Sequence, residues 1–234
     1  FSMKNPALTI LCVFALLLSP AAKAQIDEDQ LGAWYMYFWG KRLDDSNWGF
    51  QGDVQYRNWD LGGDLEQLLI RGGVTYTPDN SNILYTLGYA NITSGEFDSG
   101  GIASRENRIY QEALIPQKLG ERVYLRHRFR FEQRWVEDQD FRTRFRYALF
   151  MDIPLNRTDL KTGAWYLAFY NEIFLNGQEE IGDGREVDIF DRDRLYGALG
   201  YSITDTLRVQ GGYMYQWSEN VDKGQLQLSL HQAW

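Results

Sequence analysis

Hydrophobic and polar residues alternate with a period of two along most of the chain after residue 25. The clearest example is Arg122–Trp135, where apolar residues such as Phe129 alternate with charged residues such as Arg130. Successive side chains of a β-strand point to opposite faces, so this spacing separates an apolar face from a charged one. No segment after residue 25 keeps an apolar period of 3.6 residues, and we therefore expect an all-β protein.

Segments with this alternation follow one another and are separated by Gly, Asp and Asn. Strands are predicted near 48–59, 66–77, 83–95, 107–117, 122–135, 141–153, 163–175, 188–203, 206–217 and 225–234. A further aromatic segment, Ala33–Leu43, precedes them. It is interpreted as an eleventh strand with a missed partner, a plug strand or a closing hairpin.

The predicted connections alternate in character. One set is short, as at Gly120-Glu121 and Thr204-Asp205, and the other tends to be longer and acidic, as at Asp98–Glu106 and Gly177–Val187. Short turns at one end and longer loops at the other are typical of outer-membrane barrels. We predict a single antiparallel transmembrane β-barrel of about 10–12 strands, formed by residues 33–234, with its short turns facing the periplasm.

A soluble β-sandwich or lipocalin-like barrel is the alternative, with the charged face outward. Two features favour the membrane barrel. The first is that Trp and Tyr of the apolar face often lie near strand ends, as interfacial girdles do: Tyr56, Tyr76, Tyr85, Tyr89, Trp135, Trp165, Tyr201, Tyr213 and Trp217. The second is that the last alternating segment ends at Trp234, which resembles the signal read by the outer-membrane assembly machinery. The expected partners are outer-membrane lipid and that machinery.

The first 24 residues have the features of a secretory signal peptide. Lys4 supplies a positive charge, Ala7–Leu18 is an apolar run, and Ala22-Lys23-Ala24 fits the small-residue cleavage pattern. A membrane anchor helix is the alternative, but a span needs about 20 apolar residues. We predict export through the Sec pathway, cleavage after Ala24, a short tail at 25–32 and location in the bacterial outer membrane.

Composition narrows the function classes. The chain has 24 Lys and Arg against 32 Asp and Glu, a net charge of −8, which argues against a nucleic-acid partner. Its single Cys rules out a disulfide framework and a cysteine-based metal site. A mean hydropathy of −0.45 is too polar for a helical membrane protein. No cofactor is expected.

The alternation also predicts what lines the interior. One Arg on the lipid face would cost about 2–4 kcal/mol at mid-depth, so the charged face must be the lumen. The inward basic residues are then Arg57, Arg71, Arg108, Arg126, Arg128, Arg130, Arg134, Arg142, Arg144, Arg146, Arg192, Arg194 and Arg208, and the inward acids are Asp53, Glu112, Glu132, Asp152 and Glu172. The lumen is therefore net positive, although the chain is net negative.

From this inward set, the candidate lumen or anion-binding residues are Arg108, Arg126, Arg128, Arg130, Arg134, Arg142, Arg144, Arg146, Arg194, Glu112, Glu132 and Glu172. One interpretation is a small anion-preferring, porin-like channel or an anion pocket, because Arg binds carboxylate and phosphate through paired hydrogen bonds. Small anionic solutes, such as acidic sugars, would be its partners. The other is a plugged scaffold barrel, because a barrel of this size is narrow and Glu112, Glu132 and Glu172 can pair with Arg on neighbouring strands.

An outer-membrane lipid-modifying hydrolase is a weaker interpretation, since it needs a Ser–His pair near the outer rim. The chain has only His127, on the apolar face of its strand, and His231, near the chain end. No catalytic residue is predicted, and the protein is interpreted as not being an enzyme. No metal site is predicted either. One acidic run departs from any calcium-loop signature and is interpreted as a solvated loop: Asp183, Glu186, Asp188, Asp191 and Asp193.

Several motifs occur together in a characteristic order. They are Glu106-Asn107-Arg108, RFEQRW at Arg130–Trp135, RFRYAL at Arg144–Leu149, Asn171-Glu172-Ile173-Phe174 and DRDRLYGALGY at Asp191–Tyr201. As a set they resemble the bacterial outer-membrane barrel family catalogued as domain of unknown function 2490. The resemblance covers about residues 33–234. It implies a Gram-negative outer-membrane location and supplies no activity or catalytic residues.

Overall fold

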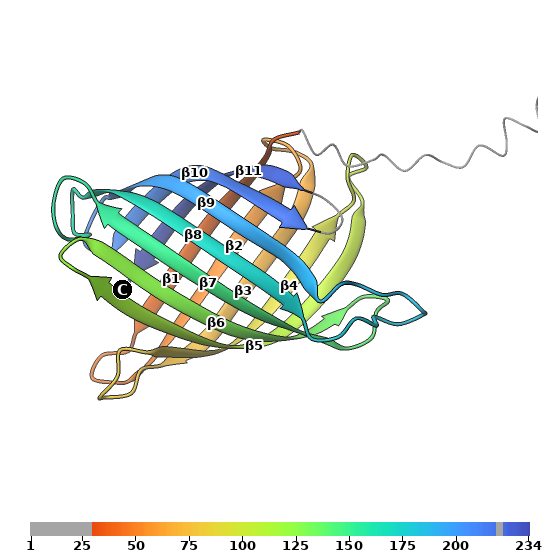
Figure 1. The fold of residues 1–234 in the computed structure, drawn as a ribbon, viewed down its shortest axis with the longest axis horizontal. Coiled ribbons are helices and arrows are strands. Elements are labelled where there is room, and N and C mark those ends of the chain that lie inside the picture. The colour runs from red at the N-terminus through yellow and green to blue at the C-terminus, as the bar shows by residue number, and fades with distance from the viewer. Residues whose placement is uncertain (1–29, 219–221) are drawn as a thin grey trace, which may run out of the picture.

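The computed structural model describes residues 30–218 and 222–234. The predicted signal peptide and residues 25–29 of the predicted tail lie outside this part of the chain. Eleven strands form one closed barrel (Figure 1). They are β1 (Gly32–Arg42), β2 (Trp48–Asn58), β3 (Leu65–Tyr76), β4 (Leu84–Gly95), β5 (Ile102–Leu119), β6 (Val123–Val136), β7 (Arg142–Pro154), β8 (Trp165–Asn176), β9 (Phe190–Ser202), β10 (Leu207–Ser218) and β11 (Lys223–Ala233). In the described ranges, no helix is long and apolar enough to cross a membrane.

The ten strands predicted after residue 47 are all present, and the largest difference in their bounds is at β5. This strand begins at Ile102 rather than at residue 107, and its first residues pair with the end of β4. Ala33–Leu43 forms most of an eleventh strand, β1, so the plug and hairpin interpretations of this segment are wrong.

The barrel closes through β1, which pairs antiparallel with β2 and parallel with β11. The parallel register runs from Gly32 opposite Gln225 to Gly40 opposite Ala233. The prediction of a wholly antiparallel barrel is therefore wrong at this seam. When successive strands are joined as hairpins, an odd number makes the first and last strands run in the same direction, so they can only pair in parallel. As a result, the start of β1 and the end of β11 lie at opposite ends of the barrel.

The strand order places the two predicted sets of connections at opposite ends of the barrel, but the predicted difference in length is wrong for several of them: the β7–β8 connection spans residues 155–164, whereas the β6–β7 connection spans only 137–141. The connections β1–β2, β3–β4, β5–β6, β7–β8 and β9–β10 share one end, called here the turn end. The other five connections share the opposite, loop end. There Asp98, Asp138 and Asp183 have φ values of 55°, 57° and 56°. Asp tolerates this left-handed conformation better than most residues, which is one physical reason for acidic residues in these loops.

Two connections at the turn end are tied to each other. The backbone N–H and the hydroxyl of Thr162 donate hydrogen bonds to Asp205 Oδ1 at 2.9 and 2.6 Å. Thr162 lies between β7 and β8, and Asp205 lies between β9 and β10. These two hydrogen bonds favour the ionised carboxylate and lower the pKa of Asp205.

The two faces of the sheet have the predicted chemistry. Phe129 is 50% exposed on the outer face, whereas its neighbour Arg130 is 6% exposed on the inner face. Outward aromatic rings pack in pairs at both ends of the barrel: Trp165 against Tyr201 at the turn end, 4.7 Å between centroids, and Trp135 against Phe141 at the loop end, 5.3 Å. The outward face is therefore apolar and the enclosed face is charged, the reverse of the arrangement in a soluble barrel.

Apolar side chains fill part of the interior beside the charged ones. Leu69, Ala90, Ile92 and Tyr110 form one buried cluster on β3, β4 and β5. The Tyr110 ring lies directly over Gly88, where an added Cβ would come within 2.2 Å of the ring. Glycine at this position leaves room for the aromatic ring inside the barrel.

Candidate anion-binding interior

Glu132 on β6 is the centre of a network of ion pairs on the inner wall. Its side chain is 1% exposed, and its two oxygens lie 2.6 Å from Arg144 Nη2 and 2.6 Å from Arg146 Nη1, both on β7. Arg108 and Arg130 approach the same carboxylate at 3.9 and 3.8 Å. Because β6 and β7 are adjacent and antiparallel, the register places Arg144 opposite Glu132. Four guanidinium groups therefore surround one buried carboxylate.

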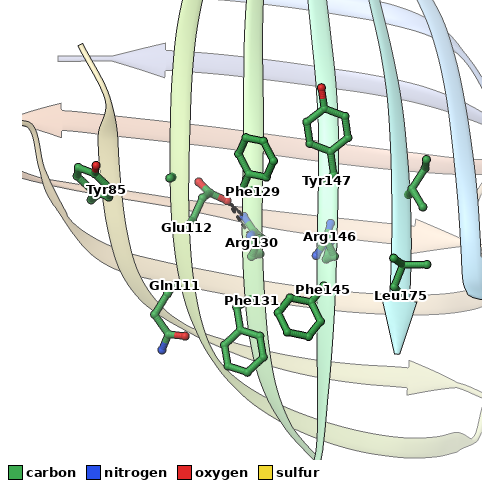
Figure 2. Close-up of a pocket in the computed structure, with 12 residues that line it drawn as sticks. Tyr85, Gln111, Glu112, Phe129, Arg130, Phe131, Phe145, Arg146, Tyr147 and Leu175 are labelled. Atoms are coloured by element: carbon green, nitrogen blue, oxygen red, sulfur yellow. Dashed lines mark hydrogen bonds and ion pairs between the residues drawn. The ribbon is translucent and has the colours of Figure 1, made fainter. Parts of the chain in front are cut away.

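Two further carboxylates extend the network along β5. Glu106 accepts hydrogen bonds from Arg108 on its own strand and from Arg134 on β6, each at 2.5 Å. Glu112 pairs with Arg130 at 2.5 Å, as the dashed line in Figure 2 shows. Charge-assisted hydrogen bonds of this kind are stronger than neutral ones and fix the planar guanidinium groups in place.

The network continues beyond β7 through two acids on β8 and β9. Glu172 binds Arg128 at 2.5 Å and Arg146 at 2.6 Å. Asp191 binds Arg144 at 2.7 Å and Arg192 at 2.9 Å. The ion pairs thus join five consecutive strands, β5 to β9, from inside the barrel.

All twelve predicted lumen residues lie on the inner face. Ten of them are buried, and Arg126 and Arg128 are partly buried. The network contains nine of the twelve. Arg126 instead pairs with Asp152 at 2.8 Å, nearer the turn end. Arg142 and Arg194 have no carboxylate within 4 Å among the described residues.

The sequence interpretation missed Glu106 and Asp191 as interior residues. Glu106 lies two residues before Arg108, so the same alternation identifies it once β5 is extended towards the loop end. The interpretation of Asp191 and Asp193 as part of a solvated loop is wrong, because both lie in β9. The register between β8 and β9 shifts between Phe174 and Leu175, beside Asp191, and simple alternation fails at such an irregularity. The strand pattern alone contains no signal for that shift.

A cavity of about 240 Å³ lies in the interior beside the network. Its lining includes Trp34 of β1, Arg57 of β2 and Arg194 of β9. Tyr170 of β8 and Gln227 of β11 also line it and hydrogen-bond to each other at 2.9 Å across two intervening strands. The interior therefore combines a cross-linked charged wall with a small remaining space.

The outer wall carries a separate apolar groove of about 530 Å³ over β4 to β8. Figure 2 shows the rings of Phe129, Phe131, Phe145 and Tyr147 on these strands. Phe131 and Phe145 pack at 4.8 Å between centroids. Figure 2 also shows Arg146 on the strand that carries Phe145 and Tyr147, so both faces of one wall are visible there.

The two histidines lie on opposite faces of the barrel wall. His127 lies on the outer face, where Nδ1 is 2.9 Å from the Tyr147 hydroxyl. His231 faces the interior, with Nε2 2.9 Å from Ser229 Oγ on the same strand. In the described part of the chain, no carboxylate is hydrogen-bonded to His231, so the pair lacks the third group that orients a catalytic base. The described ranges also contain no group of three or more His, Cys, Asp or Glu placed to hold a metal ion.

These features define a closed β-barrel with an apolar exterior and an Arg-rich interior. The chain belongs to the family described as "Protein of unknown function (DUF2490)", whose model matches residues 31–227. This match confirms the resemblance carried by the five motifs. No curated protein and no solved structure is significantly similar to the chain.

Proposed function

We propose that the protein is exported, loses residues 1–24 and inserts as a β-barrel in the bacterial outer membrane. The observation that carries this proposal is the apolar outer face. Lipid cannot hydrogen-bond to the backbone, so a strand protein can span it only as a closed barrel. The strands have 11 to 18 residues, and a tilted transmembrane strand needs about 9–11.

In this proposal the turn end faces the periplasm and the loop end faces outward. The aromatic pairs at the two ends then lie at the two lipid–water interfaces. The last strand, β11, presents Leu226, Leu228 and Leu230 on its outer face and precedes Trp234. The assembly machinery would recognise this terminal strand.

The interior supports a narrow path for small anions. Inward Arg residues outnumber inward carboxylates. Arg57, Arg142 and Arg194 have no carboxylate within 4 Å among the described residues. Rings of Arg favour anions in pores because they replace part of the water lost from the ion. The positive interior is therefore matched to a negatively charged solute.

A scaffold barrel that does not conduct is the second candidate, and the low exposure of the network favours it. Glu112 also contacts Gln51 on β2 at 3.3 Å, and Tyr170 reaches Gln227, so side chains cross the interior in two directions. Well-satisfied polar networks of this kind stabilise one arrangement of the chain.

Conductance in planar bilayers tests both candidates. The refolded protein would be added to one side of a bilayer with a KCl gradient across it. A reversal potential of the sign expected for chloride supports the anion path, and cation preference refutes it. Silent insertion, shown by a folded band that shifts on boiling, supports the scaffold barrel. A protein that stays soluble and folded without detergent would contradict the membrane proposal itself.

The proposal contains no catalytic step. His127→Ala and His231→Ala are therefore expected to leave any lipid-modifying phenotype of cells that carry the protein unchanged. A phenotype lost in either variant, with the folded band retained, would instead indicate an enzyme.

A further inference from the structure

We propose that the interior cavity beside Trp34 binds a small organic monocarboxylate through Arg194 and Arg57. The inference deepens the proposed anion path, because it needs an interior that a solute can enter. It names a site on the side of the barrel where β1, β2 and β9 face the cavity. Five residues of the ion-pair network line the same cavity: Glu112, Arg128, Arg130, Arg146 and Glu172.

Arg194 presents an unoccupied pair of donors to this cavity. Its Nε donates to Gln216 Oε1 at 2.8 Å, and its guanidinium carbon lies 4.9 Å from the Trp34 ring centroid and 4.7 Å from that of Phe174. Within the described ranges, neither Nη atom has a hydrogen-bond partner and no carboxylate lies within 4 Å. The rings and Gln216 thus fix the plane of the group, and its two free Nη atoms can donate hydrogen bonds to the two oxygens of one carboxylate.

Arg57 adds a second positive charge on the same indole ring. Its guanidinium carbon lies 3.8 Å from the Trp34 centroid, and its nitrogens donate to the side-chain oxygens of Gln55 and Gln67 at 2.6 and 2.9 Å. These amide oxygens accept three hydrogen bonds from its five N–H groups and do not neutralise its charge. A buried charge without a counter-charge is costly, so the site favours an anion.

Two carboxylates lie near this pair. Glu172 is the cross-strand partner of Arg194 and lines the cavity. Glu66 accepts a hydrogen bond from Trp34 Nε1 at 2.9 Å and another from Gln225 at 3.2 Å. The lining of the cavity as a whole is net positive, because basic residues outnumber acidic ones: Arg57, Arg71, Arg126, Arg128, Arg130, Arg146 and Arg194 against Asp53, Glu112, Asp152 and Glu172. The cavity therefore retains positive charge that an anionic ligand can neutralise.

The size and lining of the cavity indicate an organic body on that ligand. An apolar cavity of about 150 Å³ holds benzene, so about 240 Å³ has room for a ring that carries a carboxylate. Tyr110, Phe150, Tyr170 and Tyr196 line the same space and offer aromatic faces. An inorganic anion would leave these faces uncovered. A benzoate-sized carboxylate fills both the charged and the aromatic parts.

Calorimetric titration of the refolded protein in detergent at low salt tests this site. The probes are benzoate, its neutral counterpart benzamide, and inorganic phosphate. We expect benzoate to bind more tightly than both. Arg194→Gln should weaken benzoate binding by roughly tenfold to a hundredfold, the value of a hydrogen bond to a charged group. Arg142→Gln is the matched control, because Arg142 is also buried without a carboxylate partner among the described residues but does not line the cavity.

Several outcomes would overturn the proposal. They are equal binding of benzamide, phosphate binding as tight as benzoate, equal effects of the two substitutions, or no heat of binding for benzoate at millimolar concentration. If Arg194→Gln does not give the folded band on unboiled gels, Arg57→Gln takes its place with the same expectation. Benzoate binding by a protein that does not conduct in bilayers would support the proposed site and contradict the proposed channel. Anion conductance without benzoate binding would contradict the proposed site and support the proposed channel.

Discussion

Substitution of Glu132 by Gln would test whether the interior ion pairs exclude water and stabilise the fold. The side chain keeps its shape in this variant and loses only its charge. Arg144 and Arg146 would each lose a partner at 2.6 Å, and the approaches of Arg108 and Arg130 would become repulsive without a central anion. All four guanidinium groups remain buried.

The expected loss can be worked from these contacts. Removing one partner of a buried ion pair costs about 3–5 kcal/mol, because it leaves an uncompensated charge. Arg144 retains Asp191 and Arg146 retains Glu172, so the lower end of that range applies. We expect the substitution to lower the free energy of unfolding by about 3 kcal/mol. The loss should depend little on salt concentration, because dissolved ions do not reach buried ion pairs.

Urea unfolding in lipid vesicles, followed by tryptophan fluorescence, measures this loss, and the temperature at which the folded band disappears on unboiled gels gives a second reading. Glu121→Gln, at an exposed turn residue with the same change in charge, is the control and should stay within about 0.5 kcal/mol of the wild type. A loss below about 1 kcal/mol for Glu132→Gln would refute the reasoning, since water would then be solvating the guanidinium groups.

Three further results are expected. Gly88→Ala should lower the unfolding free energy by about 1–3 kcal/mol, because its Cβ would lie 2.2 Å from the Tyr110 ring. Gly72→Ala is the control and should have a smaller effect, because no atom lies within 4 Å of its added Cβ. Equal losses in the two variants would contradict the packing argument. Spin labels at adjacent positions should report opposite surroundings: oxygen dissolved in lipid should relax a label at Phe129 but not one at Arg128. The reverse pattern would show that the charged face, not the apolar face, contacts lipid. A protease site placed just before β1 should be cut in intact cells, whereas one in the β9–β10 turn should be protected; cleavage of both, or of the turn alone, would contradict the proposed orientation.

The strands were predictable because the two faces differ so strongly in chemistry. In a run such as Arg126–Trp135, the alternation shows directly which side chains share a face. A shift of the strand by one residue would turn the charged side chains outward and the apolar ones inward. The same argument correctly placed the twelve candidate residues on one face. It needed no knowledge of which strands are neighbours.

The pairing partners required the structure, because they depend on register between strands. Glu172 reaches Arg128, which lies two strands away, and Asp191 joins the network only because the register shifts beside it. The pairing of β1 with β11, which closes the barrel, could not be predicted from a local sequence pattern either. Ala33–Leu43 has the alternation of a strand, but its parallel partner lies almost the whole length of the barrel away in sequence.

The parallel seam between β1 and β11 also limits how this chain could be rearranged. In a barrel with an even number of strands, both chain ends emerge on the same side, and a few residues suffice to join them into a circular permutant. Here a linker from the end of β11 to the start of β1 would have to travel the height of the apolar band, about 25 Å, or roughly eight extended residues. In the proposed outer-membrane location, its route would be through hydrocarbon or through an interior already occupied by side chains. The parallel seam therefore disfavours circular permutation of this barrel.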